Sequence, residues 1–230
     1  MLKKIILIAG GALLSFQASA VAIVSNTSAV PGTAFNTVAL TGFSTTSSQM
    51  VGSLVSVSFA DGSSSSASWA AAGATGTGFS LTLAGDSFSA NWTLTNTSGS
   101  KGIVGFSFDG RPGNTVFDIA SPGTGSPGSA NGRAFSSVNG PATISLAQGV
   151  YSDTLAVDGT FYGDLYLKLA VSFTGALGSD QSLTFVADTD NADVAKGGIT
   201  PAIPEPETYA LMLAGLALVG AVARKRRAQA

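Results

Sequence analysis

The 230-residue sequence contains no cysteine and no histidine. These absences exclude disulfide bonds, catalysis by Ser–His or Cys–His pairs, and zinc held by histidine or cysteine. Charge is also scarce: between residues 21 and 203 there is no glutamate, and five basic residues stand against eleven aspartates, so this part carries a net charge of −6. Because nucleic acids and anionic membrane surfaces both require a basic face, we expect neither as a partner.

The first twenty residues have the pattern of a secretory signal peptide. Lys3 and Lys4 precede an apolar stretch at 5–14, and Ala18-Ser19-Ala20 follows it. A positive start, a short apolar segment and an Ala-x-Ala cleavage site define such a signal. We therefore predict export, with cleavage after Ala20 and a signal peptide at 1–20.

The last residues combine an uncharged apolar run at 209–223 with the basic cluster Arg224, Lys225, Arg226 and Arg227. A helix of this length rises roughly 22 Å, whereas a bilayer core is about 30 Å thick, so it would be a short transmembrane helix. The basic cluster predicts a stop-transfer signal that stays in the cytoplasm. The predicted topology therefore has the N-terminus outside and the C-terminus inside, with only a few residues in the cytoplasm.

Just before this run stands Pro204-Glu205-Pro206. A Pro-Glu-Pro motif, a short apolar helix and a terminal arginine-rich cluster, in this order, resemble the PEP-CTERM sorting signal of Gram-negative bacteria. The resemblance covers about the last thirty residues. It implies that an exosortase is a partner, that the contact with the inner membrane is transient, and that the protein ends at the cell surface or outside the cell. It also implies an association with exopolysaccharide and biofilm.

The part between the two targeting ends reads as short strands separated by turns. We predict an all-β fold, an antiparallel β-sandwich of jelly-roll or Greek-key type, at 21–193, followed by a linker at 194–203 and the sorting signal at 204–230. The longest alternating run places Leu165, Leu167, Leu169, Val171 and Phe173 on one face. Residues 63–66 and 122–132 are predicted loops, and the strands are expected at 54–59, 79–83, 87–95, 103–108, 116–119, 143–146, 150–157, 161–173 and 182–186.

One run suggests a metal. Asp188, Asp190, Asn191 and Asp193 place three carboxylates and an amide within six residues after a strand. Calcium takes six to eight oxygen ligands of this kind, but the run lacks the glycine and the distal glutamate of an EF-hand loop. A polar loop that closes the last strand is the favoured interpretation, and these four residues are the calcium candidates if an ion is bound there. Convergence of Asp109, Asp118, Asp164 and Asp188 at one end of the sandwich would favour the ion.

Other chemistry has less support. Lys168 falls on the polar side of a strand, which favours a solvated lysine over a Ser–Lys catalytic pair. A pair of aspartates for glycoside hydrolysis is possible but not indicated, because most aspartates stand beside glycine or in turns. Trp92 shares a face with Phe88 and Leu94 and is predicted to lie in the core, whereas Tyr166 faces away from the apolar positions and is the better surface candidate for sugar binding.

Taken together, the residues and the resemblance predict an exported protein without enzymatic activity. Its expected role is that of a structural or interaction component of the cell surface or extracellular matrix. The alternative is a carbohydrate-binding module for exopolysaccharide, stabilised by calcium. A hydrolase that uses aspartates alone is the third possibility.

Overall fold

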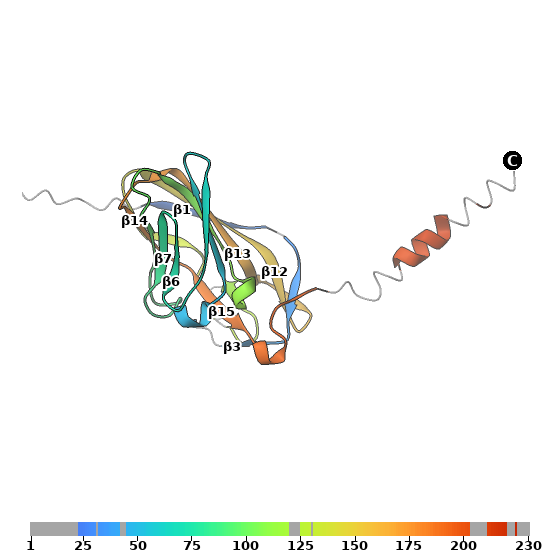
Figure 1. Ribbon diagram of the computed structural model, residues 1–230. Helices are drawn as coiled ribbons and strands as arrows, with labels where there is room; N and C mark the ends of the chain where they lie inside the picture. The colour runs from blue at the N-terminus through green and yellow to red at the C-terminus, as the bar shows by residue number, and fades with distance from the viewer. Residues whose placement is uncertain are drawn as a thin grey trace, which may run out of the picture.

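The computed structural model describes residues 23–30, 32–41, 45–119, 125–129, 131–202, 211–219 and 224 (Figure 1). The predicted signal peptide, the Pro204-Glu205-Pro206 motif and Lys225 to Arg227 lie outside these residues. Residues 211–219 are helical, within the segment predicted to cross the membrane. No helix among the described residues is long and apolar enough to span a bilayer, so the signal peptide and the transmembrane helix stay predictions.

The described residues between 23 and 202 are mostly β-strand, in two sheets, as predicted. The larger sheet has eleven strands: β1 (Val24–Ala29), β2 (Phe35–Thr37), β3 (Leu40–Thr41), β4 (Leu54–Phe59), β5 (Ser64–Ser68), β9 (Ile103–Asp109), β10 (Thr115–Asp118), β12 (Ile144–Val157), β13 (Thr160–Leu177), β15 (Asp188–Ala192) and β16 (Thr200–Pro201). The smaller has five, in the order β11 (Ser136–Asn139), β14 (Ser182–Val186), β8 (Trp92–Asn96), β7 (Phe79–Leu83) and β6 (Gly73–Gly76).

Three short 3₁₀ helices interrupt the strands: η1 (Ser47–Met50), η2 (Arg111–Gly113) and η3 (Val194–Lys196). Most strand pairs are antiparallel, and the longest is the hairpin of β12 and β13, which turns at Asp158-Gly159. Two pairs depart from the predicted antiparallel pattern, because β1 and β2 both run parallel to β12. Parallel pairing needs a crossover rather than a tight turn, and no local turn signal announces it.

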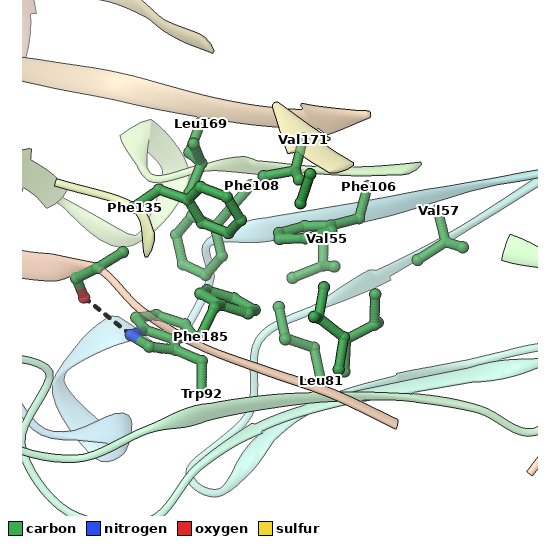
Figure 2. Packing of buried hydrophobic residues seen from close by; sticks show 14 of the residues in the cluster. Val55, Val57, Leu81, Trp92, Phe106, Phe108, Phe135, Leu169, Val171 and Phe185 are labelled. Atoms are coloured by element: carbon green, nitrogen blue, oxygen red, sulfur yellow. Dashed lines mark hydrogen bonds between the residues drawn. The ribbon is translucent and has the colours of Figure 1, made fainter. Parts of the chain in front are cut away.

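The two sheets meet across a core rich in aromatic residues (Figure 2). Phe106 and Phe108 from β9 face Trp92 from β8 and Phe185 from β14, with ring centroids 5.3–5.6 Å apart for Phe106–Phe185 and Trp92–Phe108. Phe106 and Phe185 are stacked, and Trp92 and Phe108 meet edge-on; pairs of both kinds at this spacing add stabilisation beyond the area they bury. The predicted core position of Trp92 is correct: it is 1% exposed, and its indole N–H donates to the Ala187 carbonyl at 2.8 Å.

Two segments differ from their predicted structure because neighbouring elements override the local pattern. Residues 63–66, predicted as a loop, lead into β5, where Ser66 pairs with Ser56 of β4. The strand predicted at 87–95 begins only at Trp92, since residues 87–90 form a turn in which Ala90 N–H donates to the Asp86 carbonyl at 2.9 Å. Serine is a poor indicator of a strand, and only pairing with β4 orders it here.

A second, smaller core covers the opposite face of the large sheet at one end. It contains Leu165 and Leu167 of β13, Val116 of β10 and Leu40 of β3. The apolar face predicted along β13 is therefore divided between two cores, since Leu169 and Val171 belong to the first. Both faces are covered at this end, so four consecutive residues from Asp164 to Leu167 are buried.

Candidate functional site

The candidate site lies where β10 and β15 pair at this doubly covered end of the large sheet. Residues 188–192 form the strand β15 and not the polar loop that the sequence suggested, because they pair with β10. Asp188 is directly opposite Asp118, and Asp190 is opposite Val116. Alternation along the strands places Asp188 and Asp190 on the same face as Asp118. All three aspartates are 0% exposed.

A loop segment closes over these carboxylates. Ser126 and Ser129, in the part of the predicted 122–132 loop that the structure describes, are both buried. The Ser126 backbone N–H donates to Asp164 Oδ2 at 2.9 Å, and the Ser129 hydroxyl donates to Asp118 Oδ2. Gly132 packs so tightly against the Asp118 carboxylate that a Cβ at this position would overlap it. The described part of the 122–132 loop therefore packs closely over the Asp118 and Asp164 carboxylates.

The hydrogen-bond inventory of the cluster leaves several oxygens unused. Asp188 Oδ1 accepts from the Ser87 hydroxyl and from the Thr189 backbone N–H, both at 2.9 Å. Five other buried oxygens make no hydrogen bond of good geometry: both carboxylate oxygens of Asp190, Asp188 Oδ2, Asp164 Oδ1 and Ser126 Oγ. The Ser129 hydroxyl is nevertheless close enough to Asp190 to lower its pKa through a hydrogen bond. Buried polar atoms are nearly always well paired, so these five oxygens in one cluster are an exception among buried groups.

The pKa values of Asp188 and Asp190 are both raised above the ordinary value for aspartate. The pKa of Asp190 is raised to about 8, chiefly by burial and also by the charges of Asp188, Asp118 and Asp164, although a hydrogen bond from the Ser129 hydroxyl opposes the rise. Burial likewise raises the pKa of Asp188 to about 7, with smaller contributions from Asp118 and Asp86. Strongly perturbed carboxylates of this kind concentrate at functional sites.

Compensating positive charge does not reach the middle of the cluster. Among the ion pairs of the described residues, none includes Asp164, Asp188 or Asp190. Arg133 is next to the cluster through its backbone, which bonds to Asp118 and Asp188, but its guanidinium donates to the Phe88 carbonyl and lies over the Phe88 ring. As the side chains lie, the described residues contain no group of three or more carboxylates arranged as a ready-made metal site.

The structure separates the four calcium candidates. Asp188 and Asp190 join the cluster, but Asn191 points elsewhere: its Oδ1 accepts from Thr45 and its Nδ2 donates to the Gln49 carbonyl. Asp193 caps η3 by accepting from the Ala195 N–H at 3.0 Å, and it pairs with Lys196. The sequence analysis did not identify Ser126 and Ser129 as part of the site. It also missed the strand at 188–192, for which the spacing of Asp188, Asp190 and Ala192 by two was an available signal of a strand with one buried face.

Asp118 and Asp188 lie directly opposite each other, and the charge of Asp164 reaches Asp190, but these carboxylates do not form a group that could hold a metal, and Asp109 lies apart from them. Asp109 accepts from the Arg111 guanidinium at 2.5 Å. Lys168 pairs with Asp153 at 2.8 Å and reaches Asp109 at 4.0 Å. Lys168 is therefore half-buried in an ion-pair network, and the hydrogen bonds found for it among the described residues give no serine partner for a Ser–Lys pair.

The aromatic residues considered for sugar binding are partly displaced from the surface. Tyr166 is 6% exposed and packs on Tyr151 with ring centroids 5.9 Å apart, so the prediction that it is a surface residue is wrong. Its face of β13 packs into the larger aromatic core, to which the neighbouring Phe117 of β10 also belongs. Trp69 and Trp92 are buried as well, whereas Tyr162 remains 42% exposed.

Comparison with known proteins places one segment. Residues 202–227 match the PEP-CTERM protein-sorting motif, in agreement with the predicted sorting signal at 204–230. No curated protein and no solved structure matches the chain. The chain thus carries a PEP-CTERM protein-sorting motif at residues 202–227.

Proposed function

We propose that the two-sheet body is a non-catalytic interaction component of the cell surface or extracellular matrix, and that it associates with exopolysaccharide in biofilm. The sorting motif supports the location, since an exosortase passes its substrates outward. The absence of histidine and cysteine supports a role without catalysis. So does the burial of Asp118, Asp188 and Asp190, because carboxylates at 0% exposure offer no contact to a glycan.

The observation that carries an interaction role is the hydroxyl-lined outer face of the large sheet. Adjacent strands place Ser58, Gly105 and Ser172 in one cross-strand row, and Ser56, Ser107 and Ala170 in the next. Ser64 and Ser66 of β5 extend the two rows on one side. These rows are polar and uncharged, so the face offers hydrogen-bond donors and acceptors to a neutral, hydrated polymer.

The same face is hollowed. Gly105 presents no side chain between Ser58 and Ser172, and the hollow around it has a volume of about 380 Å³. It is lined by residues of four strands: Ser58, Val104, Gly105, Phe106, Ser107, Val150, Ala170, Val171 and Ser172. A cavity of this size is within the range of small-ligand sites. The hollow favours the second candidate function, a carbohydrate-binding module that holds a sugar unit of the polymer.

A bulky side chain in the hollow tests this candidate. The Ala170→Trp variant places an indole on the exposed side of β13, and we expect it to weaken retention in an affinity gel containing the organism's own exopolysaccharide at least tenfold, about 1.4 kcal/mol. Thr82→Trp, on the exposed side of β7 in the other sheet, is the matched control and should migrate like the wild type. Equal retention of both variants would exclude the hollow as the sugar site.

The sorting motif gives a second prediction. Replacing Pro204, Glu205 and Pro206 together by alanine should leave an uncleaved precursor in the inner membrane, because the exosortase would no longer recognise its substrate. Intact mass spectrometry of fractionated cells checks this. The wild type should yield a mass that ends near residues 204–207, and a variant released with the same mass as the wild type would contradict the role of these residues.

A further inference from the structure

We propose that the tip of the β12–β13 hairpin, residues 158–163, rests on the lipid surface of the membrane while the precursor is anchored there. These residues are all exposed, and they include Phe161, which is 55% exposed, and Tyr162, which is 42% exposed. Aromatic side chains suit the membrane–water interface, where a ring meets lipid and a polar group meets water. The contact orients the body before the exosortase processes the tail. It requires the predicted membrane segment and does not depend on the proposed sugar binding.

Strand pairing places the hairpin tip beside the point where the chain leaves the body. Phe161 is opposite Ala156 of β12, which lies beside Asn36 of β2. Asn36 in turn pairs with Thr200 of β16. Three strand spacings therefore separate Phe161 from Thr200, or about 14 Å. The turn of the hairpin and β16 lie at the same end of the body (Figure 1).

Two exposed valines extend the apolar surface around β2. Val38 and Val194 are both more than half exposed. The carbonyl of the residue before Val38 accepts from the Asp158 N–H at 2.8 Å, and the carbonyl of the residue after it accepts from the Asp193 N–H at 2.9 Å. These bonds hold Val38 between the hairpin tip and the segment that contains Val194. Grouped apolar side chains, unlike single exposed ones, indicate an interaction surface.

The predicted membrane segment begins close to this end of the body. Residues 203–208 separate Ala202, the last described residue of the body, from the apolar run at 209–223. A chain of this length spans at most about 25 Å, so a bilayer that holds the run lies within that distance of Ala202. Leu211 and Leu218 of the described helix are exposed, which leaves their side chains free for lipid. Because the tether keeps lipid at a high local concentration, even a weak contact is sufficient.

The charges at this end favour zwitterionic over anionic lipid. Asp158 in the hairpin tip is exposed, and Lys196 is paired with Asp193 at 3.5 Å. The charges of the pair offset each other, so the tip presents a negative charge. Anionic headgroups repel this charge, whereas the rings of Phe161 and Tyr162 can enter among zwitterionic headgroups without a basic partner.

The test uses tryptophan fluorescence of the full chain reconstituted into phosphatidylcholine vesicles. Trp69 and Trp92 are 1% exposed in the core, so lipid does not reach them. The Phe161→Trp variant adds an indole at the hairpin tip. We expect this added emission to shift to shorter wavelength in the vesicles, and to be mostly lost when the lipid is brominated phosphatidylcholine, which quenches on contact.

Val138→Trp is the matched control, because Val138 is exposed in β11 of the small sheet. Its added emission should persist in brominated vesicles. If Phe161→Trp does not fold, Tyr162→Trp replaces it with the same expectation. Equal quenching of the tip and control variants, no quenching of the tip variant, or a chain that does not float with the vesicles would overturn the proposal. Shielding of the tip from aqueous iodide only when exosortase is reconstituted as well would assign the tip to the protease and overturn the lipid contact.

Discussion

The protein should lose stability as the pH is raised from 5 to 7. The pKa values of Asp188 and Asp190 are raised to about 7 and about 8 in the folded chain, far above 3.8, the ordinary value for aspartate. The folded state therefore binds more protons than the unfolded state throughout this interval, so the free energy of unfolding falls with rising pH. Stability is greatest near the lower end and is lost as the pH passes through the folded pKa values.

The size of the stability loss follows from the link between proton binding and the free energy of unfolding. One carboxyl group loses about 1.4 kcal/mol for each pH unit inside the window, so Asp190 alone accounts for roughly 3 kcal/mol between pH 5 and 7. For a domain of this size, Tm should fall by about 6–12 °C.

The composition of the chain leaves few other groups that titrate between pH 5 and 7. The chain has no histidine or cysteine to titrate there, and the carboxyl groups with lowered pKa act elsewhere. The pKa of Asp61 is lowered by its hydrogen bond from Lys101 and by Ser63. The pKa of Asp153 is also lowered: burial raises it, but the hydrogen bond from Lys168 and other contacts outweigh burial. Their contributions are lost only in more acidic solution, as pH falls through the folded pKa values.

Thermal melts in EDTA at a series of pH values measure the effect. The double variant Asp188→Asn, Asp190→Asn should give a nearly flat profile between pH 5 and 7, because its amides do not titrate. Asp158→Asn should follow the wild-type profile. A wild-type Tm that is constant, or that rises with pH in this interval, would show that the cluster is not held in a desolvated state.

The second large effect is expected in the aromatic core. Phe108 is 1% exposed and makes ring contacts with Trp69, Trp92 and Phe117 at centroid distances of 5.4–5.6 Å. Phe108→Ala removes these contacts and leaves a cavity that the two sheets can close only in part. Such truncations cost about 3–5 kcal/mol. We expect Tm to fall by roughly 6–20 °C.

Phe161→Ala is the control for Phe108→Ala, because it makes the same substitution at an exposed position. Phe161 is 55% exposed in β13, and its truncation should change the free energy of unfolding by less than about 0.5 kcal/mol. Chemical denaturation of both variants, with equal slopes, gives the two values directly. Similar losses for the two variants would mean that the sheets do not meet through Phe108.

The sequence pattern alone predicts the β class and several strands well. Alternating residues at 54–59, 79–83 and 103–108 correspond to β4, β7 and β9, because each has one face in the core and one face outward. The pattern fails to predict strands that form only because they pair with strands distant in the sequence. The serines of β5 are ordered by β4, and β1 and β2 lie parallel to β12 through long-range contacts.

At the candidate site, too, the sequence identified some residues and only the tertiary structure identified the others. Sequence spacing identified Asp188 and Asp190 as notable but grouped them with Asn191 and Asp193, because proximity along the chain was the only available guide. In the structure, strand alternation turns Asn191 away, and Asp193 caps η3. Asp118 and Asp164 replace them through the pairing of β10 with β15 and β13.

The sequence by itself determined which chemistry is excluded and that the chain carries a sorting motif. The absence of histidine and cysteine, and the sorting motif at 202–227, are properties of composition and order that need no fold. Only the tertiary structure decided that aspartates from distant parts of the chain share one dry cluster. Burial depends on strand register and on the segment that covers the sheet, and these long-range contacts turn ordinary carboxylates into strongly perturbed ones.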